Sequence, residues 1–191
     1  MEKKIRMSEE TNCDNVDKKI RATIEKIIKK FKENPQAWND ERQVHYDFFK
    51  LLFDVFSPEE VKENFVWEYR VGRPSYASGN KVAEVDLGMF CGNGNWIAVE
   101  FEFDLSPGDK KGGLEKELIR CIEKLQSSPK CLNSMFRGYV VPLLRRDGQA
   151  IARGYGITYP ELCTKNIQKA ENSIRISNIK LILDGIILDK R

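Results

Sequence analysis

Apolar residues recur every three or four positions in the first third of the chain. Over residues 16–34, isoleucines and a phenylalanine follow this spacing with lysines between them, which predicts an amphipathic helix. A second helix is predicted to begin at Asn39 or Asp40, either of which can cap it, and to end at Ser57–Pro58. Residues 1–14 carry no such pattern, so we expect them to be disordered.

The period of the pattern then changes from 3.6 to 2. Strands are predicted over three runs rich in β-branched and aromatic residues, Phe65–Val71, Val82–Phe90 and Trp96–Asp104. Between the second and third runs, the sequence Cys-Gly-Asn-Gly-Asn at 91–95 is a hairpin turn signal. We therefore expect three consecutive antiparallel strands.

Beyond the third strand the helical period returns. A helix is predicted over residues 113–126, and the next strand over 138–144. Two strands joined through a crossover helix run parallel, because only antiparallel neighbours can be joined by a tight turn. After residue 144 the signals weaken, and we expect a short helix near Thr158–Pro160 and a last strand within Ile174–Leu183. The order α-α-β-β-β-α-β predicts a mixed α/β fold with helices on both faces of a central sheet.

Composition limits the class of protein. With 41% hydrophobic and 32% charged residues, a chain of 191 residues has the balance of one globular domain, spanning residues 1–191. No apolar run approaches the roughly 20 residues that span a bilayer. The first residues also lack the apolar region of a secretory signal. We therefore expect a cytoplasmic protein without a membrane partner.

The cysteines and the histidine exclude several chemistries. The five cysteines are odd in number and contain no Cys-x-x-Cys pair, which argues against a zinc knuckle or a redox motif. We expect them to be buried free thiols. His45 is the single histidine of the chain, so a His-rich zinc site is excluded and a Ser-His-Asp triad would depend on this one residue.

Positive charge is concentrated in the middle of the chain. The net charge is only +3, but residues 109–146 contain nine cations against four anions. A solvated charged face and a surface for a polyanion such as nucleic acid both account for this excess.

Carboxylates gather on the second and third predicted strands. Glu84 and Asp86 lie two residues apart on one strand, and Glu100 and Glu102 do so on the next. Residues two apart share a face of a strand, so the hairpin would bring these acids together, with Phe101 on the opposite face. One interpretation is a solvated sheet face, where Glu84 in particular is expected to meet solvent. The other is a site for Mg²⁺, which prefers oxygen ligands.

The segment 85–103 resembles the core hairpin of the PD-(D/E)XK nuclease superfamily, which includes many type II restriction endonucleases. In that family an acid on one strand is followed by Glu-x-Lys on the next, within an α-β-β-β-α-β core that would here span residues 39–144. Asp86 matches the first acid and Glu100, 14 residues later, the second. Glu102 stands where the family usually has lysine, although some restriction endonucleases also have Glu-x-Glu.

This resemblance implies a Mg²⁺-dependent endonuclease that hydrolyses DNA. One or two ions would be held by Asp86, Glu100, Glu102 and the backbone carbonyl of Val99. Family members often carry a further catalytic Glu on the helix before the sheet, and Glu41 is the candidate. It lies on the apolar stripe of the second predicted helix, which points it toward the sheet. The alternative is that Glu41 is a first-turn acid favoured by the helix dipole.

Cations that follow the third strand are candidates for contacts with DNA. Lys110, Lys111, Lys116 and Arg120 would contact phosphates. One of the three lysines would supply the ammonium missing at position 102, and the alternative, which the sequence favours, is that each of them is solvated. A two-fold homodimer is expected, because its symmetry suits cleavage of both strands. Residues 145–191 would add a DNA-recognition or dimerisation element. The alternative function is a noncatalytic nucleic-acid-binding module on the same fold.

Overall fold

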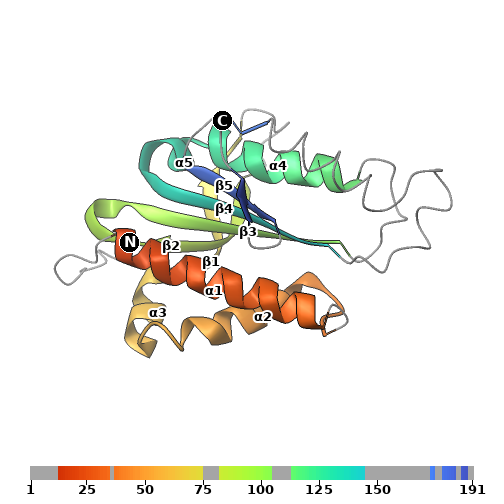
Figure 1. Ribbon diagram of the computed structural model, residues 1–191. Coiled ribbons are helices and arrows are strands. Elements are labelled where there is room, and N and C mark those ends of the chain that lie inside the picture. Colours follow the sequence, from red (N-terminus) through yellow and green to blue (C-terminus); the bar gives the residue numbers. More distant parts are fainter. Residues whose placement is uncertain are drawn as a thin grey trace.

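The described part of the protein forms three layers, with a sheet between two groups of helices (Figure 1). In this computed structural model the described residues are 13–34, 37–74, 82–104, 113–144, 173–174, 178–183 and 186–188. The helices are α1 (Cys13–Glu33), α2 (Glu41–Leu52), α3 (Pro58–Asn64), α4 (Gly113–Ser127) and α5 (Pro129–Ser134). The strands are β1 (Phe65–Gly72), β2 (Ala83–Phe90), β3 (Trp96–Asp104), β4 (Met135–Leu144), β5 (Ile179–Leu183) and β6 (Ile186–Leu188).

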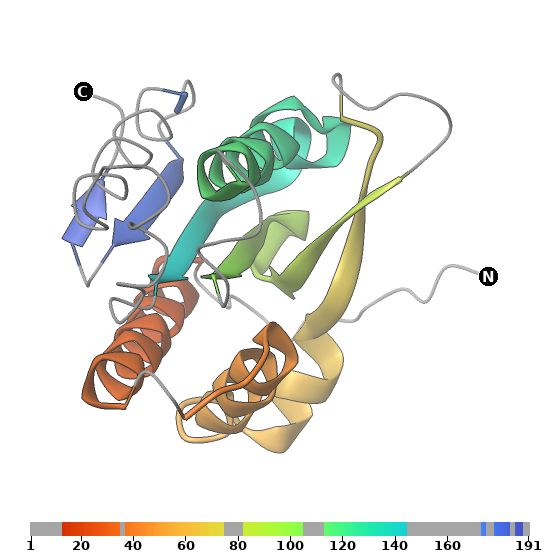
Figure 2. The ribbon, with the colours of Figure 1, turned by 90° about the vertical axis from the view of Figure 1, so that its right-hand side faces the viewer.

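The sheet is mixed and its strands lie in the order β1-β2-β3-β4-β5-β6, with β1 and β6 at opposite edges (Figure 2). β1, β2 and β3 are consecutive antiparallel neighbours, and β4 lies parallel to β3 and β5. These pairings confirm the predicted antiparallel hairpins and the crossover through α4. β6 was not predicted, and most of 145–191, including Thr158–Pro160, lies outside the described residues.

The helices begin and end partly where the sequence predicted. The side chain of Asp40 accepts a hydrogen bond from the backbone of Gln43 and so caps α2. The prediction that this helix continues to Ser57–Pro58 was wrong, because α2 ends at Leu52 and Ser57 caps the separate helix α3. The prediction of disorder was wrong for residues 13 and 14, since α1 begins at Cys13, and residues 1–12 lie outside the described residues. None of the helices in the described ranges is long and apolar enough to cross a bilayer.

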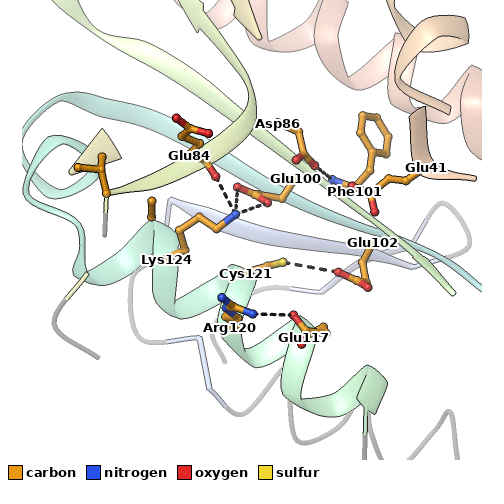
Figure 3. A pocket seen from close by; sticks show the side chains of 12 residues that line it. Glu41, Glu84, Asp86, Glu100, Phe101, Glu102, Glu117, Arg120, Cys121 and Lys124 are labelled. Atoms are coloured by element: carbon orange, nitrogen blue, oxygen red, sulfur yellow. Dashed lines mark hydrogen bonds and ion pairs between the residues drawn. The ribbon is translucent and has the colours of Figure 1, made fainter. Parts of the chain in front are cut away.

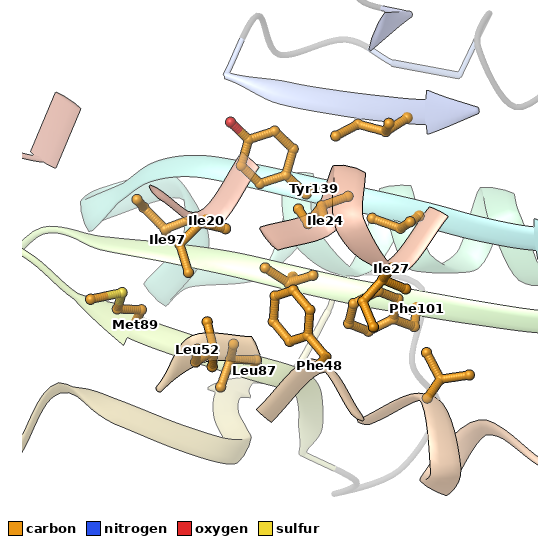
Figure 4. Close-up of a cluster of buried hydrophobic side chains, with 14 of the residues drawn as sticks. Ile20, Ile24, Ile27, Phe48, Leu52, Leu87, Met89, Ile97, Phe101 and Tyr139 are labelled. Carbon is orange, nitrogen blue, oxygen red and sulfur yellow. The ribbon is translucent and has the colours of Figure 1, made fainter. Parts of the chain in front are cut away.

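A hydrophobic core lies on each face of the sheet. On one face, α1 and α2 pack side chains such as Ile24 and Phe48 against strand residues such as Leu87, and all three are fully buried (Figure 4). On the other face, α4 packs Leu118 and Ile122 onto the same sheet. The sheet is therefore covered on both sides, and polar side chains on its inner strands lie in largely buried surroundings.

A disulfide bond joins Cys13 and Cys91, which are 78 residues apart. The expectation of free thiols was therefore wrong for this pair. Packing of α1 on the sheet brings its first residue to the end of β2, a proximity that spacing along the chain does not reveal. Cys121 and Cys131 are buried free thiols, as expected, and Cys163 lies outside the described residues.

Candidate active site

The candidate site lies where two neighbouring strands separate. β2 and β3 are paired from Phe90 and Trp96 as far as Leu87 and Val99, and no further. At the next residue of β2, Asp86 reaches across the opening and its Oδ2 accepts a hydrogen bond of 2.7 Å from the backbone N–H of Phe101. The local separation of the strands thus positions this carboxylate between them.

β3 divides its side chains between the two faces, as the alternation predicted. Phe101 and Phe103 pack in the core beneath α1 and α2, whereas Glu100 and Glu102 point toward α4 (Figure 3). Glu100 is 2% exposed, so it is a buried carboxylate and not part of a solvated sheet face. A buried carboxylate requires a compensating charge.

Lys124 of α4 supplies that charge. Its Nζ donates hydrogen bonds of 2.8 Å to both carboxylate oxygens of Glu100 and to the backbone carbonyl of Glu84. Burial and the nearby charge of Asp86 nevertheless raise the pKa of Glu100 to about 8, against the opposing effect of Lys124. Although burial favours the neutral amine, Glu100 raises the pKa of Lys124 above its usual range.

The sequence did not single out Lys124, and the lysines that it named instead are not tested by the structure. Lys110 and Lys111 lie outside the described residues, as does the side chain of Lys116. Lys124 follows Cys121 by three positions, so it shares the side of α4 that faces the sheet, and this spacing was the signal available in the sequence.

A second cluster forms beside Asp86 from the first turns of α2. Nε2 of His45 lies 3.5 Å from Oε1 of Glu41 and 3.5 Å from Oδ2 of Asp86. One ligand atom from each of the three residues lies within 4.8 Å of the other two. The ring of His45 also stacks on Trp67, with 5.7 Å between ring centroids. The helical spacing of four thus aims Glu41 and His45 at the same point of the sheet.

In this second cluster, burial and the nearby negative charges change the pKa values of Glu41 and His45. Burial and the charge of Asp86 raise the pKa of Glu41. Burial favours the neutral form of His45, but the negative charges of Asp86 and Glu41 raise its pKa. The two contacts of Nε2 at 3.5 Å are long for hydrogen bonds, and this buried atom has no hydrogen-bond partner among the described residues. A neutral His45 that carries its proton on Nδ1 offers the lone pair of this nitrogen to a cation.

His45 was expected only as a possible triad member, so its place beside Glu41 and Asp86 was not predicted. The available signal was the pair Glu41 and His45, four residues apart on a helix that precedes the acidic strands. Glu41 itself is half-buried and lies beside Asp86, as its place on the stripe predicted.

An open pocket of about 370 Å³ lies beside Glu41, Asp86 and Glu100. Its wall includes Glu102, whose carboxylate lies 3.9 Å from the thiol of Cys121, and Arg120, which pairs with Glu117 at 3.5 Å. Val99 lies in the last pair of the β2–β3 ladder, with its side chain in the core. Glu84 is exposed and pairs with Arg70 at 3.0 Å, which confirms its expected contact with solvent.

Comparisons with known proteins identify no relative. No model of a protein family, no curated protein and no solved structure matches the chain. What the site can do is therefore inferred from its own residues. The residues considered for catalysis that line the pocket are the acids Glu41, Asp86, Glu100 and Glu102 and the ammonium group of Lys124. The imidazole of His45 lies beside Glu41 and Asp86.

Proposed function

We propose that the protein is a metal-dependent endonuclease that hydrolyses phosphodiester bonds in DNA on a restriction-endonuclease-like core. One observation carries the proposal: Glu41, His45 and Asp86 converge within 4.8 Å beside the buried pair of Glu100 and Lys124. The order of the elements and the antiparallel hairpin followed by a parallel crossover also support it.

The donor set of Glu41, His45 and Asp86 fits a divalent cation. It combines two carboxylates with a buried imidazole nitrogen that has no hydrogen-bond partner among the described residues. Carboxylates suit Mg²⁺ and Mn²⁺, and the imidazole favours Mn²⁺ over Mg²⁺. When bound, such an ion lowers the pKa of a coordinated water and stabilises charge that develops on the phosphate. Glu100, Glu102 and the carbonyl of Val99 are the proposed ligands of a second Mg²⁺ or Mn²⁺.

Lys124 takes the role that lysine has in the family pattern. Its ammonium group lies 2.8 Å from Glu100, although it comes from α4 and not from position 102 of the strand. There it can orient a water molecule or stabilise negative charge near the scissile phosphate. Arg120, exposed at the edge of the pocket, is the proposed phosphate contact, and Lys110, Lys111 and Lys116 stay predictions, as does the homodimer.

Cleavage of plasmid DNA tests the proposal. Wild-type protein should nick or linearise supercoiled plasmid with Mn²⁺ or Mg²⁺ and be inactive in EDTA. Asp86→Asn should lose cleavage by at least 100-fold, because it removes a charged ligand. Glu84→Gln is the matched control: it removes an exposed carboxylate two residues away on the same strand and should keep full activity. Inactivity of the wild type with every divalent ion, or full activity of Asp86→Asn, would exclude the proposed mechanism.

A noncatalytic nucleic-acid-binding module is the second candidate. It is favoured by one observation: both oxygens of Glu100 accept hydrogen bonds from Lys124, so a metal ion at Glu100 would have to displace that ammonium group. Such a module would retard DNA in a gel equally with and without divalent ions and would cut none of it. The plasmid assay therefore separates the two functions.

A further inference from the structure

An exposed stripe of cationic and aromatic side chains runs along α2. It consists of Arg42, Tyr46 and Lys50, which follow one another at intervals of four residues and so lie on one face of the helix. All three are exposed, and the ring of Tyr46, at 61%, is the most exposed large hydrophobic side chain of the described residues. Nζ of Lys50 lies 4.4 Å from the centre of that ring.

This stripe lies directly beside the candidate metal ligands. Arg42 and Tyr46 each follow a site residue, Glu41 and His45, by one position. One residue advances roughly 100° around a helix of 3.6 residues per turn, so the two rows are neighbours. The stripe therefore lies one row away from Glu41 and His45 on the same helix.

The chemistry of the stripe suits a nucleic-acid strand whose bases are unpaired. An exposed aromatic ring offers a stacking surface to any base, and flanking cations attract phosphates. The backbone positions of Arg42 and Lys50 are roughly 12 Å apart along the helix axis, at 1.5 Å per residue. The ammonium group of Lys50 lies over one face of the Tyr46 ring, so a base would stack on the other face. In a duplex the faces of the bases are covered by their neighbours, so stacking on Tyr46 requires an unpaired base.

The acids nearest to the stripe have other partners: Asp40 caps α2 through the backbone of Gln43, and Glu41 lies 3.5 Å from His45. Asp47, on the next row of α2, is bound to Lys30 and accepts a hydrogen bond of 2.8 Å from Nε1 of Trp38. Arg42 forms no ion pair with any residue in the part of the chain that the structure describes. Its guanidinium group is therefore open to an anionic ligand.

We propose that the stripe of Arg42, Tyr46 and Lys50 binds an unpaired stretch of DNA, so that the substrate is single-stranded DNA or a duplex with a single-stranded segment. One base stacks on Tyr46, and the phosphates on either side contact the two cations. This inference rests on the proposed nuclease function, since it places the unpaired strand next to the metal site.

Fluorescence anisotropy in EDTA tests the stripe without any cleavage. The probes are a labelled 20-nucleotide single strand and the duplex of the same sequence. Tyr46→Ala should weaken single-strand binding by about 5-fold or more, the low end for loss of one stacked base, and leave duplex binding unchanged. Tyr46→Phe should keep the affinity, because the stacking ring remains.

The cations give a separate measurement. Arg42→Gln and Lys50→Gln should each lower the slope of log affinity against log salt by about 0.7 for the single strand. Lys29→Gln, which removes an exposed lysine from α1, is the matched control and should leave the slope unchanged. Unchanged single-strand binding in Tyr46→Ala overturns the inference, and so does an equal loss of duplex and single-strand binding.

The outcomes separate this inference from the proposed function. Wild-type protein that binds the single strand through Tyr46 but cuts no DNA with any divalent ion refutes the nuclease and supports the stripe. Conversely, metal-dependent cleavage with unchanged binding in Tyr46→Ala supports the nuclease and overturns the stripe. Thermal melting of each variant checks that its fold is intact, and Tyr46→Phe tests the ring without removing it.

Discussion

Loss of the disulfide bond between Cys13 and Cys91 should lower the melting temperature by about 10 °C. The bond closes a loop of 78 residues. In the chain-entropy account a loop of this length destabilises the unfolded state by about 4.5 kcal/mol. For a chain of this size each kcal/mol corresponds to about 2–4 °C, so 10 °C is the lower part of the expected range.

The variant Cys13→Ser removes the bond with little other change, because Cys13 is half-buried and lies at the start of a helix. Cys91→Ser should be more damaging, since residue 91 is fully buried and an unpaired hydroxyl there costs about 1–3 kcal/mol more. Both variants are to be melted by circular dichroism with and without a reductant. The reductant should lower the melting temperature of the wild type and leave that of Cys13→Ser unchanged.

Thiol titration gives an independent check. In denaturant without reductant, the wild type should expose at most three reactive thiols of its five cysteines, and two more after reduction. Five reactive thiols before reduction, or a melting temperature of Cys13→Ser within 2 °C of the wild type, would refute the reasoning.

Three further predictions concern the site. Burial raises the pKa of Glu100 from 4.5 to about 8, so the folded protein holds this proton more tightly than the unfolded chain does. The resulting stabilisation is complete below pH 4.5 and is lost as the pH rises toward 8. Glu100→Gln should therefore flatten the curve of unfolding free energy against pH in this window. Lys124→Met removes the charge that lowers the pKa of Glu100, so Glu100 should stay protonated to a higher pH, and the loss of stability relative to the wild type should grow as the pH rises past 8, as urea unfolding will measure. Mn²⁺ at ten times its Kd should stabilise the wild type by about 1.4 kcal/mol, as measured by calorimetry. His45→Ala should abolish most of this gain. An equal response of both proteins would exclude His45 as a ligand.

The local period of the sequence predicted the sheet well. Alternation from Val99 to Phe103 predicted which side chains face each layer, because a strand repeats every two residues whatever surrounds it. The parallel position of β4 followed from the length of the crossover. By contrast, Ser57–Pro58 is both a stop signal and a helix start, so the sequence pattern alone left α3 undetected.

The candidate site was only half predictable, because its parts meet through tertiary packing. Asp86 and Glu100 share one hairpin and could be paired from spacing alone. Lys124 reaches Glu100 only because α4 packs on the face that carries the acids. His45 reaches Asp86 only because β2 and β3 separate beneath α2. The Cys13–Cys91 bond depends on the docking of α1 in the same way.

The carboxylate of Asp86 has two roles: it is a proposed metal ligand, and it accepts the hydrogen bond from the backbone N–H of Phe101. Where β2 and β3 part, Oδ2 of Asp86 replaces the strand carbonyl that the amide of Phe101 would otherwise meet. Asparagine at this position keeps an oxygen acceptor, whereas alanine leaves the amide unpaired and opens the sheet. The exchange rate of that single amide proton with deuterated solvent is thus a direct spectroscopic gauge of whether the carboxylate is held in place. A ligand that pulls Asp86 away from the backbone would be seen as faster exchange at Phe101 before any product forms.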